Sequence, residues 1–304
     1  MNKFIFLLKH PFHLFESLGH AGLLNWMNDK TYLSILYRIR MKKRIDWNNL
    51  ETYSEKLQWI KLYDRNPLYT DLVDKYKVKE YVESIIGNEY IIPTYGIWNN
   101  ANDIDYKSLP NQFVLKCTHD SGGIYICTNK SNINIKKINK KLNHCLKHNF
   151  YYGQREWPYK NVKPRIIAEK YMVDESNYEL KDYKFFCFNG KPKYMFIAKD
   201  RNNQNEETKF DFFDMNFNHL NLINGHPNAS EKYNKPNNFS KMVELASKLS
   251  KGIPQVRVDF YDINGKIYFG EMTFFHWSGL MPFEPEEWDK KFGELIDLSK
   301  IAKK

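Results

Sequence analysis

The sequence predicts a mixed α+β fold, because strand-like runs and helical patterns both recur along its 304 residues and no repeat period is visible. Hydrophobic residues make up 42% and aromatic residues 16% of the chain, which is too much apolar surface for a protein that stays unfolded. A chain of this length can bury a substantial core, as one large domain or as two closely packed ones.

Two helices are predicted in the stretch 51–87. Thr52 and Glu55 have the spacing of a capping box, in which each side chain accepts a backbone N–H of the first helical turn, and Pro67 ends the helix that begins there. A second helix is expected over about 70–86, with Gly87 as its C-terminal cap. The polar face of this second helix carries three lysines, Lys75, Lys77 and Lys79.

Strand-like runs dominate the rest of the chain and fall in two groups, 90–128 and 165–273. The individual runs are 90–98, 113–118, 124–128, 165–172, 183–198 with a hairpin turn at Asn189-Gly190, 209–215 and 256–273. Helical patterns are expected at about 135–149, 240–251 and 287–299. Asn- and Lys-rich stretches at 200–208 and 224–238 are predicted to be loops.

The N-terminal residues 4–27 mix Phe, Leu, Trp and Met with Lys and His, which is typical of an amphipathic helix at a membrane surface. Such a helix also packs onto its own domain, so peripheral contact with the inner face of the membrane stays an alternative. The apolar stretch 4–8 is too short for the core of a signal peptide, and no later stretch approaches the roughly 20 apolar residues that span a bilayer. We therefore expect a cytoplasmic protein.

The formal charge of +10 indicates an acidic partner, which could be nucleic acid, anionic lipid, a nucleotide or an acidic polysaccharide. Nucleic acid is disfavoured, because the aromatic residues follow core spacings instead of alternating with Lys and Arg. The four cysteines show no CxxC pair and no metal-ligand spacing, so we expect neither a zinc site nor a disulfide framework. These cysteines are Cys117, Cys127, Cys145 and Cys187.

The segment "VRVDFYDINGKIYFGEMTFFHWSG" (256–279) is predicted to be a hairpin around Asn264-Gly265. A two-residue turn would leave Asp259 and Glu271 on opposite faces, whereas a three-residue loop with Gly265 in the left-handed conformation gives the other parity. The charges can act together only in the second register. In that register four polar side chains share one face of the hairpin, namely Arg257, Asp259, Glu271 and Thr273.

Two carboxylates on one face repel each other unless a cation lies between them. Mg²⁺ suits such a pair, since it takes one or two carboxylates together with phosphate oxygens. An ion pair between Arg257 and Asp259 or Glu271 on a solvated face accounts equally well for the same residues. The hairpin alone does not choose between these interpretations.

Two further segments have features of a nucleotide site. In "FVLKCTHDSGGIYIC" a strand that carries Lys116 runs into a glycine-containing loop, and loops of this kind let backbone N–H groups approach phosphates. In "IIAEKYM" a strand ends at Glu169, where a purine can bond to the backbone. Taken singly, an ordinary turn and an ordinary strand end explain both segments.

The order of these segments resembles that of the ATP-grasp superfamily, and over about 50–298 the chain is similar to its TupA-like branch, named for a protein of teichuronopeptide biosynthesis. The matching stretches are "EKLQWIKLYDRNPLYTDLVDKYKVKEYV", "IIPTYGIW", "LPNQFVLKCTHDSGG", "EKYM", "DYKFFCFNGKPKYM", "VRVDFYDINGKIYFGEMTFFHWSG" and "PEEWD". The resemblance implies an α+β ATP-grasp fold that holds ATP between two subdomains. The implied divisions are a helical extension (1–50), an N-terminal part (51–112), a lid (113–172) and a metal-binding subdomain (173–304).

The resemblance also implies roles for individual residues. The ATP-binding residues are Lys75 and Lys116 at the phosphates, Ser121, Gly122 and Gly123 in a closing flap, Glu169, Lys170 and Met172 at the adenine, and Asp182 at the ribose. Mg²⁺ is expected on Asp259, Glu271 and Thr273, the last at a position where most of the superfamily has Asn. Arg257 is expected at the transferring phosphoryl group, with Lys184, Lys199 and Arg201 at the acidic substrate and His276, Ser278 and Gly279 near the acceptor.

The implied reaction joins a carboxylate to an amine through an acylphosphate, at the expense of ATP. The expected carboxylate is a uronic acid of a surface polysaccharide, and the expected amine is an amino acid or a similar compound. Two other functions stay open at this point. The chain is alternatively a glycosyltransferase-like enzyme of polysaccharide biosynthesis, or a basic protein that binds membrane or nucleic acid without catalysis.

Overall fold

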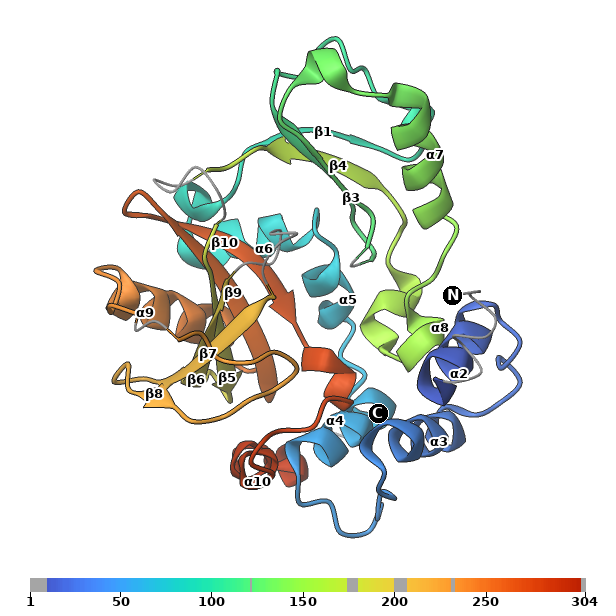
Figure 1. Cartoon of the computed structure of the whole chain (residues 1–304), viewed down its shortest axis with the longest axis vertical. Coiled ribbons are helices and arrows are strands. Elements are labelled where there is room, and N and C mark those ends of the chain that lie inside the picture. The colour runs from blue at the N-terminus through green and yellow to red at the C-terminus, as the bar shows by residue number, and fades with distance from the viewer. Residues whose placement is uncertain (1–9, 121, 174–179, 200–206, 231–232, 302–304) are drawn as a thin grey trace.

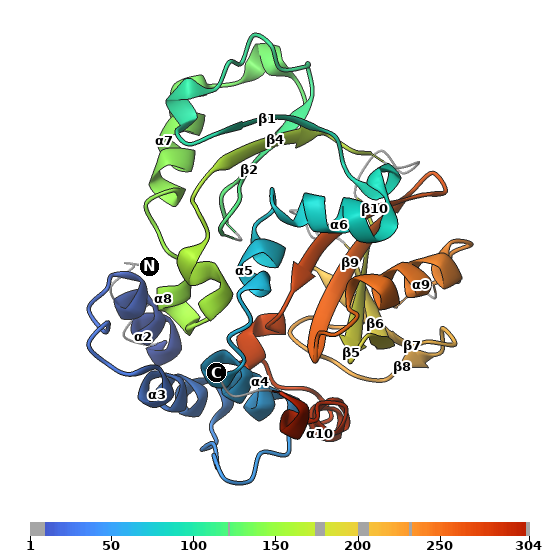
Figure 2. The same ribbon diagram turned by 180° about the vertical axis from the view of Figure 1, so that it is seen from behind.

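The computed structural model of the chain describes residues 10–120, 122–173, 180–199, 207–230 and 233–301. In these ranges two antiparallel sheets are surrounded by helices, which confirms the α+β class (Figure 1). The four-stranded sheet has the order β1-β4-β2-β3, and the six-stranded sheet has the order β10-β9-β5-β6-β7-β8. Figure 2 shows the two sheets from behind, with α5 and α6 between them.

The strands of the first sheet are β1 (Thr94–Trp98), β2 (Phe113–Cys117), β3 (Ile124–Cys127) and β4 (Ile166–Lys170). The strands of the second are β5 (Asp182–Phe188), β6 (Lys191–Lys199), β7 (Lys209–Asp214), β8 (His219–Leu220), β9 (Gln255–Ile263) and β10 (Lys266–Thr273). Because β4 pairs with both β1 and β2, the predicted grouping of 165–172 with the later strands is wrong. The predicted hairpin turn after Phe188 is confirmed, since Phe188 pairs with Lys191.

The longer helices are α2 (Pro11–His20), α3 (Asp29–Met41), α4 (Tyr53–Tyr63), α5 (Leu68–Val73), α6 (Val78–Ile86), α7 (Ile135–Cys145), α9 (Phe239–Leu249) and α10 (Glu287–Glu294). A single turn forms α8 (Tyr151–Gln154). The predicted capping box at the start of α4 is present, because Thr52 and Glu55 each accept the other's backbone N–H.

Alternation along β2 and β4 decides which side chains face the space between the sheets. Phe113 and Leu115 pack with Ile138 and Leu142 of α7, on the outer face of the four-stranded sheet. Lys116, which follows Leu115 in the strand, must therefore lie on the inner face. The same alternation in β4 puts Glu169 on the inner face beside it.

The six-stranded sheet is covered on both faces, so nearly all of its central side chains are buried. On one face Phe185 of β5 packs against Phe239 of α9, with ring centroids 6.0 Å apart. On the other face Phe186 packs against Phe292 of α10, with ring centroids 5.1 Å apart. Lys184 lies on this second face, two residues from Phe186, so charged side chains lie in an interior that is otherwise aromatic.

The single helix predicted over 70–86 is wrong, because the chain leaves the helical conformation at Asp74 between α5 and α6. The Asp74 carboxylate accepts the backbone N–H of Tyr76 at 2.9 Å and is paired with Arg165 at 2.7 Å. A short acidic side chain that bonds nearby N–H groups competes with continued helix. The break lets the backbone N–H of Lys75 bond to the carbonyl of Thr118 at 3.1 Å, next to the β2–β3 loop.

Of the two turns considered for the β9–β10 hairpin, the structure has the two-residue one. Ile263 pairs directly with Lys266, so the turn has two residues, and both have positive φ (Asn264 52°, Gly265 78°). A bulge between Phe269 and Glu271 then changes the parity. Glu271 is thereby paired with Asp259, so the two carboxylates share one face of the hairpin. The bulge, and not the turn, produces this arrangement.

The N-terminal helices α2 and α3 lie beside α8 in both views (Figures 1 and 2). Arg155, which follows α8, is buried against the ring of Tyr32 at 4.1 Å and lies 3.3 Å from the Asp29 carboxylate. Of the amphipathic segment predicted over 4–27, residues 1–9 lie outside the described part of the chain. Among the helices that the structure describes, none has the length and apolar character needed to cross a bilayer.

A buried carboxylate at the α4–α10 contact predicts a pH-dependent stability. Asp289 accepts the backbone N–H of Ser54 at 2.8 Å, and burial raises the pKa of Asp289 to about 6 from its usual 3.8. Between these two values the folded protein binds more protons than the unfolded chain, so the free energy of unfolding decreases as the pH rises. The full effect is about 3 kcal/mol.

Urea denaturation at pH 4 and at pH 7 tests this prediction with Asp289→Asn. We expect the variant to be about 2 to 3 kcal/mol more stable than the original chain at pH 7 and close to it at pH 4. The exposed Asp103→Asn serves as the control and should change neither value. Equal pH dependence in the original chain and in Asp289→Asn would contradict the prediction.

Candidate functional site

A cavity of about 270 Å³ lies between the two sheets. Its walls come from β2, β3 and β4 on one side and from β5, β9 and β10 on the other, with α6 beside them. Apolar residues in its lining include Val78, Ile92, Val114, Ile126, Met172 and Phe269. Charged residues in its lining include Lys75, Lys116, Glu169, Asp182, Lys184 and Glu271. The cavity thus combines an apolar surface with groups of both charges.

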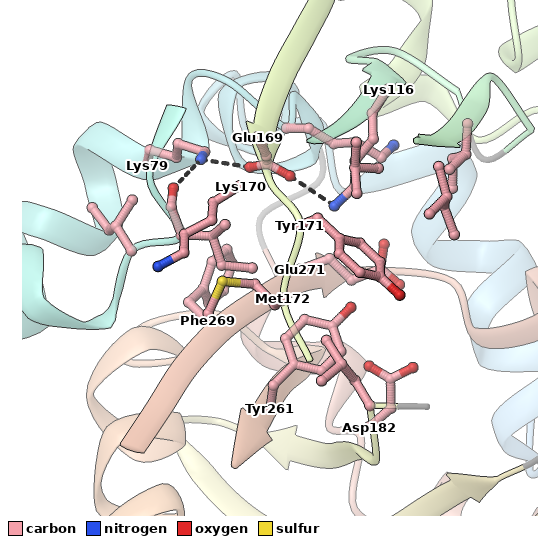
Figure 3. Close-up of a pocket in the computed structure, with 18 of the residues that line it drawn as sticks. Lys79, Lys116, Glu169, Lys170, Tyr171, Met172, Asp182, Tyr261, Phe269 and Glu271 are labelled. Atoms are coloured by element: carbon pink, nitrogen blue, oxygen red, sulfur yellow. Dashed lines mark hydrogen bonds and ion pairs between the residues drawn. The ribbon is translucent and has the colours of Figure 1, made fainter. Parts of the chain in front are cut away.

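Glu169 lies between two lysine ammonium groups, as Figure 3 shows. One carboxylate oxygen is 2.5 Å from Lys79 Nζ, and the other is 2.7 Å from Lys116 Nζ. Burial alone would raise the pKa of Glu169, but the two ammonium groups outweigh it and hold the pKa below its usual range. Glu169 is therefore an ionised hydrogen-bond acceptor at the cavity wall. A phosphate at Lys116 would compete with this pair.

Lys75 belongs to the break between α5 and α6 and lies against the loop that joins β2 and β3. Its ammonium group donates to the carbonyl of Asp120, and burial lowers its pKa. Gly123 donates its N–H to the Asp120 carboxylate at 2.9 Å, and a Cβ on Gly123 would lie 2.6 Å from Cys117 Sγ. Only glycine fits there. Around Gly122 there is open space, and the predicted flap residue Ser121 lies outside the described residues.

Asp259 is fully buried and is surrounded by cationic groups. Both of its oxygens accept from Arg257 at 2.8 Å, and Lys184 Nζ is 2.5 Å away. Burial works against the charge of Arg257, but the adjacent Asp259 carboxylate raises the pKa of Arg257 above its usual value. Of the two interpretations of the hairpin, the ion pair is therefore present, on a buried face and not on a solvated one.

Arg257 also joins the remaining members of this face. Its Nη2 donates to Glu271 at 3.1 Å and to Thr273 at 2.9 Å. Asp182, expected at a ribose, lies 3.4 Å from Lys184, and Figure 3 shows it near Tyr261. The structure thus gathers Asp182, Lys184, Arg257, Asp259, Glu271 and Thr273 at one end of the six-stranded sheet.

The donor set of this face fits a hard divalent cation. Asp259, Glu271 and Thr273 offer oxygen atoms only, which are the ligands that Mg²⁺ prefers. A carboxylate has about four lone-pair sites, so the three bonds that Asp259 accepts from Arg257 and Lys184 leave about one site for a metal ion. The side chain of Glu271 is 46% exposed and lines the cavity, so it is accessible to a metal bound with phosphates.

His276 is buried beside this face and positions Arg257. Arginine only donates, so the 2.7 Å contact from Arg257 Nη1 makes His276 Nδ1 the acceptor. Nε2–H then donates to Asn224 Oδ1 at 2.9 Å, and burial holds the pKa of His276 well below its usual value. His276 is therefore neutral, and both of its ring nitrogens are hydrogen-bonded within the protein. Its buried side chain offers no surface to the acceptor substrate that was expected there.

The turn that contains His276 is held from behind by α4. Lys61 Nζ bonds to the Ser278 carbonyl at 2.8 Å and to its hydroxyl at 2.6 Å, while Gln58 bonds to the carbonyls of Ser278 and Gly279. Ser278 and Gly279 are buried by these contacts. The residue that the turn exposes is Trp277, which the sequence interpretation did not consider. The polar contact of α4 with this turn had a signal in the sequence, because Gln58 and Lys61 share one helical face with the apolar Leu57.

Two expected substrate-binding residues lie at or beyond the end of β6. Lys199 is half-buried and pairs across the strands with Lys209 of β7. Arg201 lies outside the described residues. At the cavity, Lys170 and Met172 both belong to the lining, as expected from their place after Glu169.

The cysteines are all free, as predicted. Nevertheless the structure brings the ligand atoms of Cys117, Asp120 and Cys145 within 4.8 Å of one another, which the spacing of the cysteines in the sequence did not indicate. Burial raises the pKa of the Cys117 thiol to about 12, which disfavours the thiolate that a soft metal requires. Asp120 is already bonded to Gly123.

Comparisons with known proteins bear on this site. A family profile described as TupA-like ATPgrasp matches residues 55–297. No curated protein sequence matches the chain significantly.

Several solved structures are similar at low sequence identity. The D-alanine–D-alanine ligase from Bacillus anthracis complexed with ATP is 15% identical, with 76% of this chain and 63% of that chain covered and a TM-score of 0.43. The corresponding ligase from Helicobacter pylori is 13% identical, with 80% and 69% covered and a TM-score of 0.43. The N5-carboxyaminoimidazole synthase from Aspergillus clavatus is 14% identical, with 68% and 46% covered and a TM-score of 0.39. The chain therefore spans less than two thirds of the Bacillus anthracis ligase.

Proposed function

The chain belongs to the TupA-like ATP-grasp family, and from that premise we propose that it is an ATP-dependent ligase that joins a carboxylate to an amine. The observation that carries the proposal is the cavity between the two sheets. Lysines from α6, β2 and the α5–α6 break line one side of it, and Glu271 lines the other side, next to Arg257 and Asp259. This arrangement suits a triphosphate between cationic groups and an oxygen-ligated metal ion.

ATP is proposed to bind with its base against the apolar lining, near Met172 and Phe269. The ionised carboxylate of Glu169 would accept a hydrogen bond from the adenine amino group, and the backbone after it, at Lys170 and Met172, would contact the ring. The phosphates would then lie near Lys75 and Lys116. ATP binding would break the Glu169–Lys116 ion pair and replace it with a contact between Lys116 and a phosphate. Part of the free energy of ATP binding would therefore offset the loss of that ion pair.

The β2–β3 loop is proposed to close over the phosphates. Gly122 and Gly123 permit a close approach of the backbone, and the open space around Gly122 leaves room for it. Ser121 would belong to the same flap. Closure excludes water, which would otherwise hydrolyse a reactive intermediate.

The polar face of β9 and β10 is proposed to hold the reacting phosphoryl group. Asp259, Glu271 and Thr273 would hold Mg²⁺, which supplies positive charge to the phosphate oxygens when it is bound. Arg257 and Lys184 stabilise the negative charge that develops during transfer, since they are already fixed there by Asp259. Asp182, near Lys184, orients this ammonium group or contacts the ribose.

The proposed reaction has two balanced steps. An oxygen of the substrate carboxylate attacks the γ-phosphorus, the bond to the β–γ bridging oxygen breaks, and ADP leaves with its electron pair. The amine then attacks the acyl carbon of the acylphosphate, phosphate leaves, and the amine loses a proton to give the amide. Lys199 and Arg201 would bind the acidic substrate. His276, Ser278 and Gly279, expected near the acceptor, are buried and would act only by fixing the turn.

The proposed carboxylate is a uronic acid of a surface polysaccharide, and the proposed amine is an amino acid or a similar compound. An anionic substrate agrees with the charge of +10. The reaction would take place in the cytoplasm or at the inner face of the membrane, where ATP is available.

Calorimetry and product analysis test the proposal together. We expect the protein to bind ATP in a Mg²⁺-dependent manner and to release ADP and phosphate when a uronate and an amine are both present. A calorimetric titration with Mg²⁺ and ATP that shows no heat of binding would overturn the proposal. Turnover of a nucleotide sugar without ATP would instead show a glycosyltransferase.

A further inference from the structure

The turn 276–279 contains a rare run of left-handed residues. Trp277 has φ 48°, Ser278 has φ 57° and Gly279 has φ 63°. Only glycine adopts this conformation without cost, so the first two residues are strained. Strain of this kind persists where the surrounding structure over-determines it, and it is concentrated at functional sites.

The contacts behind the turn provide that constraint. Lys61 and Gln58 are both fully buried, and between them they bond to the carbonyl oxygens of Ser278 and Gly279. Burying a lysine is expensive, and burial lowers the pKa of Lys61, with the nearby Glu156 carboxylate opposing the shift. A buried lysine and a buried amide side chain thus both bond to one short turn.

What these contacts present to the solvent is a single aromatic side chain. Trp277 is 39% exposed, whereas His276, Ser278 and Gly279 are all buried. Gly225 makes room for the indole, because a Cβ there would lie 2.8 Å from Trp277 Nε1. Beneath and beside the indole lie Phe210, stacked at 6.2 Å, and His226, at 5.7 Å between ring centroids.

The chemistry of this surface is that of an aromatic face with a polar edge. The Nε1 edge of the indole lies against Gly225, so the part of the side chain that a ligand can contact is the remainder of the aromatic ring system. The neighbouring His226 adds a second polar ring, which burial keeps neutral by lowering its pKa. A pyranose matches such a surface, because its C–H face packs on an aromatic ring while its hydroxyls need donors and acceptors at the rim.

The position of the surface connects it to the reacting groups without overlapping the nucleotide cavity. Trp277 follows His276, whose Nδ1 is 2.7 Å from Arg257, but Trp277 is not among the residues that line the cavity. On this basis, and resting on the function proposed above, we propose that Trp277 is the stacking surface for the sugar ring of the substrate. The strained turn fixes the sugar relative to Arg257, where its carboxylate must react.

Three variants test this assignment. Trp277→Gly removes the indole and is expected to fold, because glycine adopts φ near 48° without strain. Trp277→Phe keeps an aromatic face and loses the N–H. Trp26→Ala removes the indole of Trp26, which is 78% exposed and lies in the N-terminal extension, and it is the matched control. Circular dichroism confirms folding of each variant.

The ligands are trisaccharides of glucuronate, galacturonate and mannuronate, with maltotriose as the neutral comparison, titrated calorimetrically in the presence of ADP and Mg²⁺. We expect at least one uronate to bind the original chain, Trp277→Gly to bind it about tenfold more weakly or worse, and Trp277→Phe to lose less than about threefold. Trp26→Ala should bind normally. MgADP affinity should be the same in all four proteins.

The outcomes separate this inference from the ligase itself. Equal uronate binding by the original chain and Trp277→Gly overturns the stacking surface, as does MgADP binding by an original chain that binds no pyranose. Tryptophan-dependent pyranose binding without any nucleotide binding supports the surface and overturns the ligase. A loss in Trp26→Ala equal to that in Trp277→Gly shows non-specific adhesion and also overturns it.

Discussion

Replacing Glu271 with Gln is expected to lower ADP formation by about a thousandfold and to leave the melting temperature nearly unchanged. The charge that is lost faces the cavity and is the one exposed carboxylate of the proposed metal set. The fold does not depend on it, because the side chain is 46% exposed and Arg257 keeps its two bonds to Asp259. Timed assays of ADP formation measure the first effect, and thermal unfolding measures the second.

A second measurement shows whether the loss concerns Mg²⁺. The original chain should bind ATP more tightly with Mg²⁺ than with EDTA, and Glu271→Gln should lose most of that difference. Glu294→Gln, an exposed carboxylate on α10, is the control and should behave as the original chain does. If Glu271→Gln unfolded, or if it turned over ATP normally, the hairpin charges would have to be structural.

Local signals account for the parts of the fold that were predicted from the sequence. The capping box of Thr52 and Glu55 and the turn at Asn189-Gly190 are each set by residues within a few positions of one another. For such elements the tertiary structure agrees with the local preference and adds nothing contrary.

The errors occur where a distant residue decides. Asp74 interrupts the predicted helix, and its partner Arg165 is 91 positions away in the chain. In the β9–β10 hairpin, the parity change needed for the shared face occurs at Gly270 and not at the turn. Gly270 lies against the backbone of the partner strand, where a Cβ would be 3.1 Å from the Asp259 carbonyl. The bond of Asp74 to the Tyr76 N–H is local, but its pairing with Arg165 and the approach of Gly270 to the partner strand are set by tertiary contacts.

The candidate site shows the same division. Single residues such as Lys116, Glu169 and Asp259 could be named because each lies at a recognisable place in a motif. The ion-pair partners of these residues could not be predicted, because Lys79 reaches Glu169 from α6 and Lys184 reaches Asp259 from β5. The buried Lys61 was missed because it acts on a turn 217 positions away.

Asp259→Ala is expected to destabilise the protein by about 3 to 5 kcal/mol, in contrast to Glu271→Gln. Removing this carboxylate takes the main partner from Arg257 and one partner from Lys184, both of which are buried. Buried cations without compensation carry the full cost of their lost hydration. Asp262→Ala on the same strand, whose half-buried carboxylate bonds to Asn238, is the control and should cost less than about 1 kcal/mol.

A double-mutant cycle with Arg257→Met decides whether the loss comes from the buried, unpaired charge of Arg257 or from lost packing. If Arg257 without its partner is the cause, Met in its place removes the buried charge, and the double variant should lose about 1 to 3 kcal/mol less than the sum of the single variants. Equilibrium unfolding in urea gives all three values. Additive losses would mean that Asp259 and Arg257 stabilise the fold independently. The pair would then not be the preformed charge arrangement from which Arg257 acts on a phosphoryl group.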